Sequence, residues 1–216
     1  MSKKVRNPGK YLFILSNEED YNKVISFSPI GYIDYLKNLF EFEEYIVVKL
    51  NILNSAEEFL FFSPFLEHQK WIAGRIGFPN MIHIYSYNSI EENTIHKKDE
   101  YKGILFHEIT HIYYLSSSLP QNDFLNEGFA QYFSGQPIKK LSREISKERL
   151  IKLLFTSSKE LNKTSNEILE DYYSFSQHLI KNLSENLGNK NLIDNLRKCK
   201  DNDKLLKFIE ENFQYL

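Results

Sequence analysis

The segment ILFHEITHIYY, residues 104–114, is almost entirely apolar but contains two histidines and a glutamate. Burying His107, Glu108 and His111 without partners would be costly, so the fold must supply partners for them. On an α-helix, side chains four residues apart lie on one face, with about 5–6 Å between their Cβ atoms. The segment therefore predicts a buried helix on which the imidazoles of His107 and His111 point at one shared position.

A divalent metal ion is the shared partner that this spacing favours. Zinc binds neutral histidine nitrogens, prefers tetrahedral coordination, and in catalytic sites keeps one position for water. Glu108 lies a fraction of a turn from the two histidines, where it can reach that water as a general base. Bound zinc lowers the pKa of the water to about 7. The alternative is a core helix whose histidines bond to backbone carbonyl groups.

The segment FLNEGFAQYF, residues 124–133, contains the candidate for a third ligand. Its only acidic residue is Glu127, sixteen positions after His111, and the small residue Gly128 follows it directly. The intervening SSSLPQND is typical of a loop, so a helix–loop–helix turn is expected. Asp123 on the loop side is a weaker candidate ligand, and a surface glutamate at a helix N-terminus is the alternative for Glu127.

These motifs together resemble the gluzincins, the glutamate–zinc branch of the HExxH metallopeptidases, and most closely the compact peptidase-MA-like domains. The pattern of those domains is HExxH, a loop, and then P-x-W-L-x-E-G-x-A. The present chain has Leu125, Glu127 and Gly128 in this pattern, with Phe124 where tryptophan is usual and Pro120 four positions before Phe124. Upstream, YIVVKLNILNSAEEFLFF resembles the family's strand before an S-x-E-E-F helix. WIAGRIGFPNMIHIYSY resembles its glycine turn and the strand that follows.

The resemblance implies that His107, His111 and Glu127 ligate one zinc ion and that Glu108 activates the water. It also implies a tyrosine on a later helix that stabilises the oxyanion, and Tyr173 fits the family's spacing. Tyr172 fits this spacing one residue worse, and His178, about one turn beyond Tyr173, is another candidate.

The strand expected at 81–87 resembles the one along which an extended peptide substrate pairs as an added strand. His83 on this strand is interpreted as a strand-face residue and not as a ligand. No GxMEN-like segment, which aminopeptidases use to hold a free α-amino group, is present in the sequence. Its absence favours an endopeptidase over an aminopeptidase.

Strand patterns precede helix patterns along the chain, which indicates an α+β fold. The resemblance adds a zincin-like arrangement, with an N-terminal mixed-sheet lobe, a mainly α-helical C-terminal lobe and an active-site cleft between them. One domain of residues 1–216 is expected, with lobes of approximately 1–118 and 119–216. Strands are predicted at 10–16, 45–53 and 81–87, and helices at 28–42, 55–62, 99–116, 125–134, 142–155, 164–187, 190–198 and 202–213.

Capping residues set several of these boundaries. Ser28 with Pro29 predicts one helix start, and Ser55 with Glu58 forms a capping box. Thr164 with Glu167 forms a second capping box, and Gly188 predicts the end of the long helix that follows it.

Composition restricts the location and the partners. The net charge is −2 without a basic stripe, which argues against nucleic acid as a partner. The only cysteine, Cys199, excludes an internal disulfide and a four-thiolate zinc site, and is expected to be an ordinary packed or half-exposed thiol. The apolar run 11–15 is shorter than a signal-peptide core of about 7–15 residues, and no run reaches the roughly 18 apolar residues of a membrane span. A cytoplasmic protein without membrane contact is expected.

The function that these patterns predict is a zinc metallopeptidase, a hydrolase that cleaves peptide bonds with a metal-activated water and Glu108 as the general base. Its partner would be a peptide or protein substrate, and the sequence leaves the oligomeric state open. The alternative is a non-catalytic, zinc-containing module of the same fold that binds peptides or regulates another protein.

Overall fold

The computed structural model describes residues 2–62, 70–77, 79–138, 140–141, 146–156, 158–161 and 166–213. The chain divides into two compact units, Met1–Tyr113 and Tyr114–Leu216, and helix α5 (Tyr101–Ser116) runs through the boundary. The first unit contains a five-stranded mixed sheet with helices, and the described part of the second unit is helical. The α+β class expected from the sequence is therefore confirmed.

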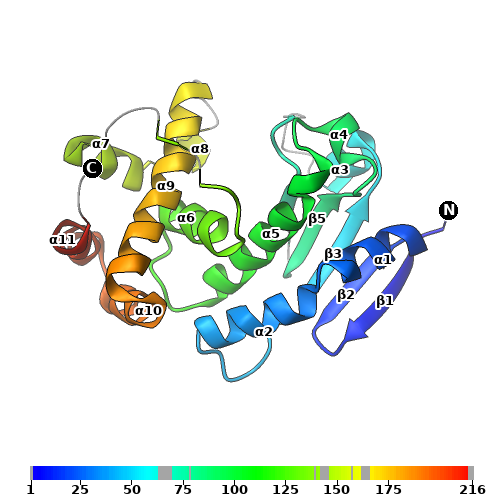
Figure 1. Ribbon diagram of the computed structural model, residues 1–216, viewed down its shortest axis with the longest axis horizontal. Coiled ribbons are helices and arrows are strands. Elements are labelled where there is room, and N and C mark those ends of the chain that lie inside the picture. Colours follow the sequence, from blue (N-terminus) through cyan, green and yellow to red (C-terminus); the bar gives the residue numbers. More distant parts are fainter. Residues whose placement is uncertain are drawn as a thin grey trace. The chain divides into compact units, whose positions relative to one another are not determined.

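The sheet has the strand order β1-β2-β3-β5-β4 (Figure 1). Strands β2, β3 and β5 are parallel to one another, while β1 and β4 pair antiparallel at the two edges. The strand bounds are β1 Lys4–Gly9, β2 Leu12–Ser16, β3 Val48–Leu53, β4 Gly74–Gly77 and β5 Met81–Tyr85. The three predicted strands are thus present as β2, β3 and β5, with ends that differ by up to three residues.

Neither edge strand was predicted, and their sequences give the reason. β1 reads KVRNPG and β4 reads GRIG, so both lack the run of β-branched residues that marks an inner strand. Proline and glycine are tolerated there because an edge strand pairs along only one side. Helix α1 (Glu18–Ser26), which follows β2, was not predicted either. The Asn17 side chain caps it by accepting a hydrogen bond from the Asp20 N–H at 2.8 Å.

Adjacent rows of side chains on the two faces of the sheet differ in character. On one face Ile14, Leu50 and Ile82 lie in register on β2, β3 and β5, and all three are buried. One residue further along, on the other face, Asn51 and His83 are paired in register on β3 and β5. Helix α3 (Ala56–Phe62) packs on this second face, where the Phe59 ring stacks on Tyr85 with centroids 4.8 Å apart.

The predicted caps of the first unit are confirmed only in part. Ser28 is the N-cap of α2 (Pro29–Leu39), but it has a left-handed φ of 57° and its side chain makes no capping hydrogen bond. The Ser55 hydroxyl accepts from the Glu58 N–H at 3.2 Å, as a capping box requires. The Glu58 carboxylate, however, accepts from the N–H of Asn54 and not from that of Ser55. Helix α4 (Ile90–Asn93) is a single turn that was not predicted.

The second unit is organised around its longest helix, α9 (Figure 1). Its helices are α6 Asp123–Phe133, α7 Lys147–Leu154, α8 Ser158–Leu161, α9 Asn166–Leu187, α10 Asn189–Lys198 and α11 Asn202–Asn212. Gly188, with φ +78°, ends α9 as predicted. The predicted helix start at 142 and the Thr164–Glu167 capping box lie outside the described residues and side chains. Cys199 is a buried free thiol, as expected.

Helices α6 and α9 approach each other closely at Gly128. A Cβ atom on this residue would lie 2.4 Å from the backbone oxygen of Ser176 and 2.7 Å from Cγ1 of Ile180. Phe124 on α6 also packs edge-on against Tyr172 of α9, with ring centroids 5.0 Å apart. The absence of a side chain at Gly128 therefore fixes how near α6, which carries Glu127, lies to α9.

Among the helices of the described residues, none combines the length and the apolar composition needed to cross a membrane.

Replacing Gly128 with alanine is expected to lower the free energy of unfolding by about 1–3 kcal/mol, because the added methyl group meets backbone that has no room to move. Urea denaturation followed by circular dichroism measures this loss. Gly31→Ala is the matched control, because a Cβ atom there meets nothing within 4 Å. Equal stabilities for the two variants would contradict the close contact of α6 with α9.

Candidate metal centre

Helix α5 is the platform of the candidate site, and it is anchored deep in the first unit. Leu105, Ile109 and Tyr113 are fully buried. The Tyr32 ring of α2 stacks on Phe106 with centroids 4.0 Å apart. A helix that is apolar on nearly all sides is held by its surroundings, so its few polar side chains have defined positions.

A hydrogen bond between Tyr32 and Thr110 also holds α5 against α2. The Thr110 hydroxyl donates to the carbonyl of Phe106, one turn earlier on α5, at 2.8 Å. Because that proton is used, the Tyr32 hydroxyl is the donor in its 2.6 Å bond to Thr110. Burial raises the pKa of Tyr32 far above its usual value, so the phenol keeps this proton at neutral pH.

The two histidines of α5 converge as their spacing predicts. Their Nε2 atoms are 2.9 Å apart, and the ring planes are nearly perpendicular at 89°. Two imidazole nitrogens on one tetrahedral zinc ion at about 2.0–2.1 Å would be about 3.3 Å apart, which needs only a small widening. His111 is buried and His107 is half-buried. The pair therefore fits a metal ion as well as it fits a direct contact.

Glu127 completes a group of three metal-binding side chains. One ligand atom from each of His107, His111 and Glu127 lies within 4.8 Å of the other two. Two imidazoles and one carboxylate are a ligand set that zinc uses in catalytic sites. The donor chemistry and the spacing of these residues thus fit a single zinc ion.

The alternatives for Glu127 do not match its surroundings. The N-cap of α6 is Asn122, whose side chain accepts from the Leu125 N–H at 2.9 Å, so Glu127 is not a capping residue. Asp123 is exposed in the first turn of α6, and the metal-binding group found among the described residues does not include it.

Glu108 lies outside this group and faces strand β4. Its side chain is 8% exposed, and a Cβ atom on Gly74 would lie 2.7 Å from its Cγ and 3.0 Å from its Oε1. Only glycine at position 74 leaves room for this carboxylate beside the strand. The sequence indicated Gly74 only as part of a glycine turn, so its role in placing Glu108 was missed.

The edge strand beside β5 is β4, which corrects the prediction that the strand at 81–87 is the substrate edge. β5 is paired on both sides, by β3 and by β4, so it cannot add a further strand. The Tyr85 N–H donates to the Ala73 carbonyl at 3.1 Å. In an antiparallel pair the hydrogen-bonded positions alternate, so the N–H and C=O groups of Gly74 and Ile76 point away from β5. They form the outer edge of the sheet within the described residues.

The residues of α9 that are candidates for stabilising the oxyanion differ in their access to solvent. Tyr172 is fully buried, and its pKa is raised by burial and further by the charges of Glu127 and Asp123. Tyr173 is half-buried, with its ring centroid 5.7 Å from that of Tyr172, and His178 is half-buried as well. A substrate can reach only a hydroxyl that keeps some exposure, so this difference favours Tyr173 over Tyr172.

His83 is a strand-face residue, as interpreted from the sequence. It is 8% exposed, its Nδ1 lies 3.1 Å from Nδ2 of Asn51, and its ring stacks on Phe62 with centroids 4.7 Å apart. Burial lowers the pKa of His83, and the nearby Arg75 charge lowers it further.

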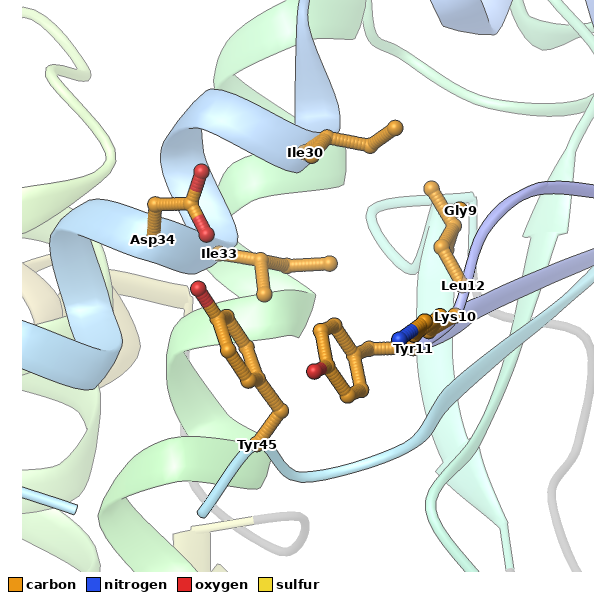
Figure 2. A pocket seen from close by; sticks show the side chains of 8 residues that line it. All are labelled: Gly9, Lys10, Tyr11, Leu12, Ile30, Ile33, Asp34 and Tyr45. Atoms are coloured by element: carbon orange, nitrogen blue, oxygen red, sulfur yellow. The ribbon is translucent and has the colours of Figure 1, made fainter. Parts of the chain in front are cut away.

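A separate cavity of 240 Å³ lies between helix α2 and the turn that joins β1 to β2 (Figure 2). The rings of Tyr11 and Tyr45 are stacked along it, with centroids 3.7 Å apart. The Tyr45 hydroxyl donates to the Asp34 carboxylate, and this bond raises the pKa of Tyr45. The lining contains one carboxylate and no imidazole or thiol, so it has no metal-binding group. The lining residues are Gly9, Lys10, Tyr11, Leu12, Ile30, Ile33, Asp34 and Tyr45.

A scan against protein-family models found no match to this chain, and a search of curated proteins found none either. The gluzincin assignment therefore stays a prediction from the HExxH…E residues. The candidate centre rests on the chemistry and the spacing of its own side chains.

One zinc ion per chain is expected to bind, measured by isothermal titration calorimetry after removal of metal with a chelator. His111→Gln removes one of three ligands and should weaken binding by at least about 100-fold, beyond the roughly 10–100-fold that outer partners contribute. His96→Gln is the control, because His96 contacts the Trp71 carbonyl and lies outside the metal-binding group. Equal zinc affinities for the two variants would refute the ligand assignment.

Proposed function

We propose that this chain is a zinc-dependent metallopeptidase of the gluzincin type with a zincin-like fold, and that it cleaves internal bonds of a peptide or protein substrate. The observation that carries the proposal is the convergence of His107, His111 and Glu127 within 4.8 Å, with Glu108 next to His107 in sequence but outside the group. A purely structural zinc site normally has a fourth protein ligand, whereas three ligands leave a position for chemistry.

When bound, zinc would supply a Lewis acid that polarises the scissile carbonyl and lowers the pKa of a water molecule to about 7. Glu108 takes a proton from the attacking water and later passes it to the leaving amine. The burial of Glu108 against Gly74 supports this role, because a confined carboxylate has one orientation in which to accept the proton. Tyr173 donates a hydrogen bond to the developing oxyanion, an interaction worth several kcal/mol in such sites.

The outer edge of β4 is where we propose that the substrate backbone pairs. The outward N–H and C=O groups of Gly74 and Ile76 would bond to an extended peptide, which adds a strand to the sheet. Gly74 contacts the Glu108 side chain, so a peptide on this edge lies close to the general base. Backbone pairing is independent of sequence, and it suits an enzyme that holds internal segments of a chain.

Replacing Glu108 with glutamine is expected to keep one bound zinc ion per chain and to lower kcat by about 10²–10⁴-fold, because glutamine cannot accept the proton. Digestion of a pool of random decapeptides, with and without chelator, followed by mass spectrometry measures this loss. Glu92→Gln, an exposed change on α4, is the control and should leave the digest unchanged.

Cleavage by the Glu108→Gln protein at the rate of the wild type would exclude the proposed mechanism. Peptides that the wild type captures with zinc bound but never cuts would instead assign the chain to the non-catalytic binding modules.

Gly74→Ala is expected to lower kcat by about 10–100-fold while zinc affinity stays within about twofold. The added methyl group displaces the Glu108 carboxylate, and a shift of about 1 Å in a catalytic group has a cost of this order. Calorimetry and the same peptide digest separate the two effects. An unchanged kcat would show that Gly74 does not place Glu108, and Gly31→Ala again serves as the control.

A further inference from the structure

A row of polar side chains spans three neighbouring strands, β3, β5 and β4, on the face of the sheet that α3 covers, and ends at the outer edge of β4. Asn51 on β3 is paired in register with His83 on β5, and His83 is paired in register with Arg75 on β4. We call these three residues the polar row. Because β4 is the edge strand, Arg75 is the member of the row nearest to an added strand.

The two inner members of the polar row are hydrogen-bonded to each other. Asn51 donates from Nδ2 to Nδ1 of His83 at 3.1 Å, and the Phe62 ring covers the imidazole at 4.7 Å. Burial and the charge of Arg75 both lower the pKa of His83, so its imidazole is neutral at pH 7. Arg75 is therefore the only charged member of the row.

The charge of Arg75 is not compensated by the described part of the chain. Its Nη1 atom is buried and makes no hydrogen bond. None of the ion pairs among the described residues includes Arg75. A buried donor without an acceptor is unfavourable, and a carboxylate is the acceptor that a guanidinium binds best.

The geometry of an added strand determines which substrate side chain meets Arg75. Side chains alternate between the two faces of a sheet, and residues directly opposite have Cβ atoms about 4.5–5.5 Å apart. A substrate residue opposite Arg75 points to the face of the polar row. Its neighbours, opposite Gly74 and Ile76, point to the other face, on which Glu108 lies against Gly74.

We propose that Arg75 selects an aspartate or glutamate side chain at one position of a peptide bound along β4. The inference rests on the proposed function, because it requires the peptide to pair with this edge. The other residues of β4 are Gly74, Ile76 and Gly77, so the strand offers a single cation and not a track of positive charge. A single cation fits one carboxylate on an extended chain and does not fit a nucleic-acid backbone.

The experiment compares zinc-loaded wild-type protein with Arg75→Gln and Arg75→Glu in a digest of random decapeptides, analysed by mass spectrometry. The wild type is expected to favour Asp or Glu by about tenfold at one position relative to the cut bond. Arg75→Gln should lose this preference, and Arg75→Glu should replace it with Lys or Arg at the same position. Arg6→Gln on β1, the opposite edge strand, is the matched control and should keep the wild-type profile.

A second readout does not require turnover. The Glu108→Gln protein is incubated with the same pool, and captured peptides are sequenced with Arg75 intact or changed to Glu. Acidic peptides should be enriched about tenfold only with Arg75 intact. Thermal denaturation of each variant establishes that it is folded.

Three negative outcomes of these experiments lead to different conclusions. Cleavage that depends on Glu108, with a profile that Arg75→Glu leaves unchanged, overturns the role of Arg75 and keeps the proposed function. Cleavage that Glu108→Gln does not affect overturns the proposed function itself. A pool that is neither cut nor captured overturns both.

Discussion

Burial holds helix α5 in place, and the positions of the candidate metal ligands follow from it. Histidines four residues apart face the same way on any helix, but they converge on an ion only if the helix itself cannot move. Leu105, Ile109 and Tyr113 fill the surroundings of α5, and Tyr32 binds it by ring stacking on Phe106 and by a hydrogen bond to Thr110. The energy of packing thus holds polar groups that would be unfavourable in the core without a shared partner.

Two glycines then place the two glutamates of the site. Gly74 leaves room for the Glu108 carboxylate against β4, and Gly128 lets α6, which carries Glu127, approach the backbone of α9. In both places the missing side chain has a positional role, since a methyl group would meet atoms at less than 3 Å. The catalytic proposal depends on these contacts as much as on the ionisable residues, because a carboxylate acts as a base or as a ligand only at the right distance.

The sheet provides the edge along which the proposed substrate would bind. Its order puts β4 at one edge of the described sheet, and Gly74 on this strand contacts the side chain of Glu108, the proposed base. The polar row brings one guanidinium, that of Arg75, to the same edge, and no ion pair joins it to another residue that the structure describes. Backbone pairing would hold many peptides, and a charge at a single register position would choose among them. Affinity and selectivity would then come from different groups of one short strand.

Features that are local in the chain could be predicted from the sequence alone. The convergence of His107 and His111 follows from helical spacing, the end of α9 follows from Gly188, and the inner strands follow from their β-branched residues. Other features depend on the tertiary structure. They are the order of the strands, the position of β4 at an edge, the contact of Gly74 with Glu108, and the burial of Tyr172 while Tyr173 stays half-buried. Each of these depends on which distant segments meet, and the pairing of strands far apart in the chain leaves no periodic pattern in either of them.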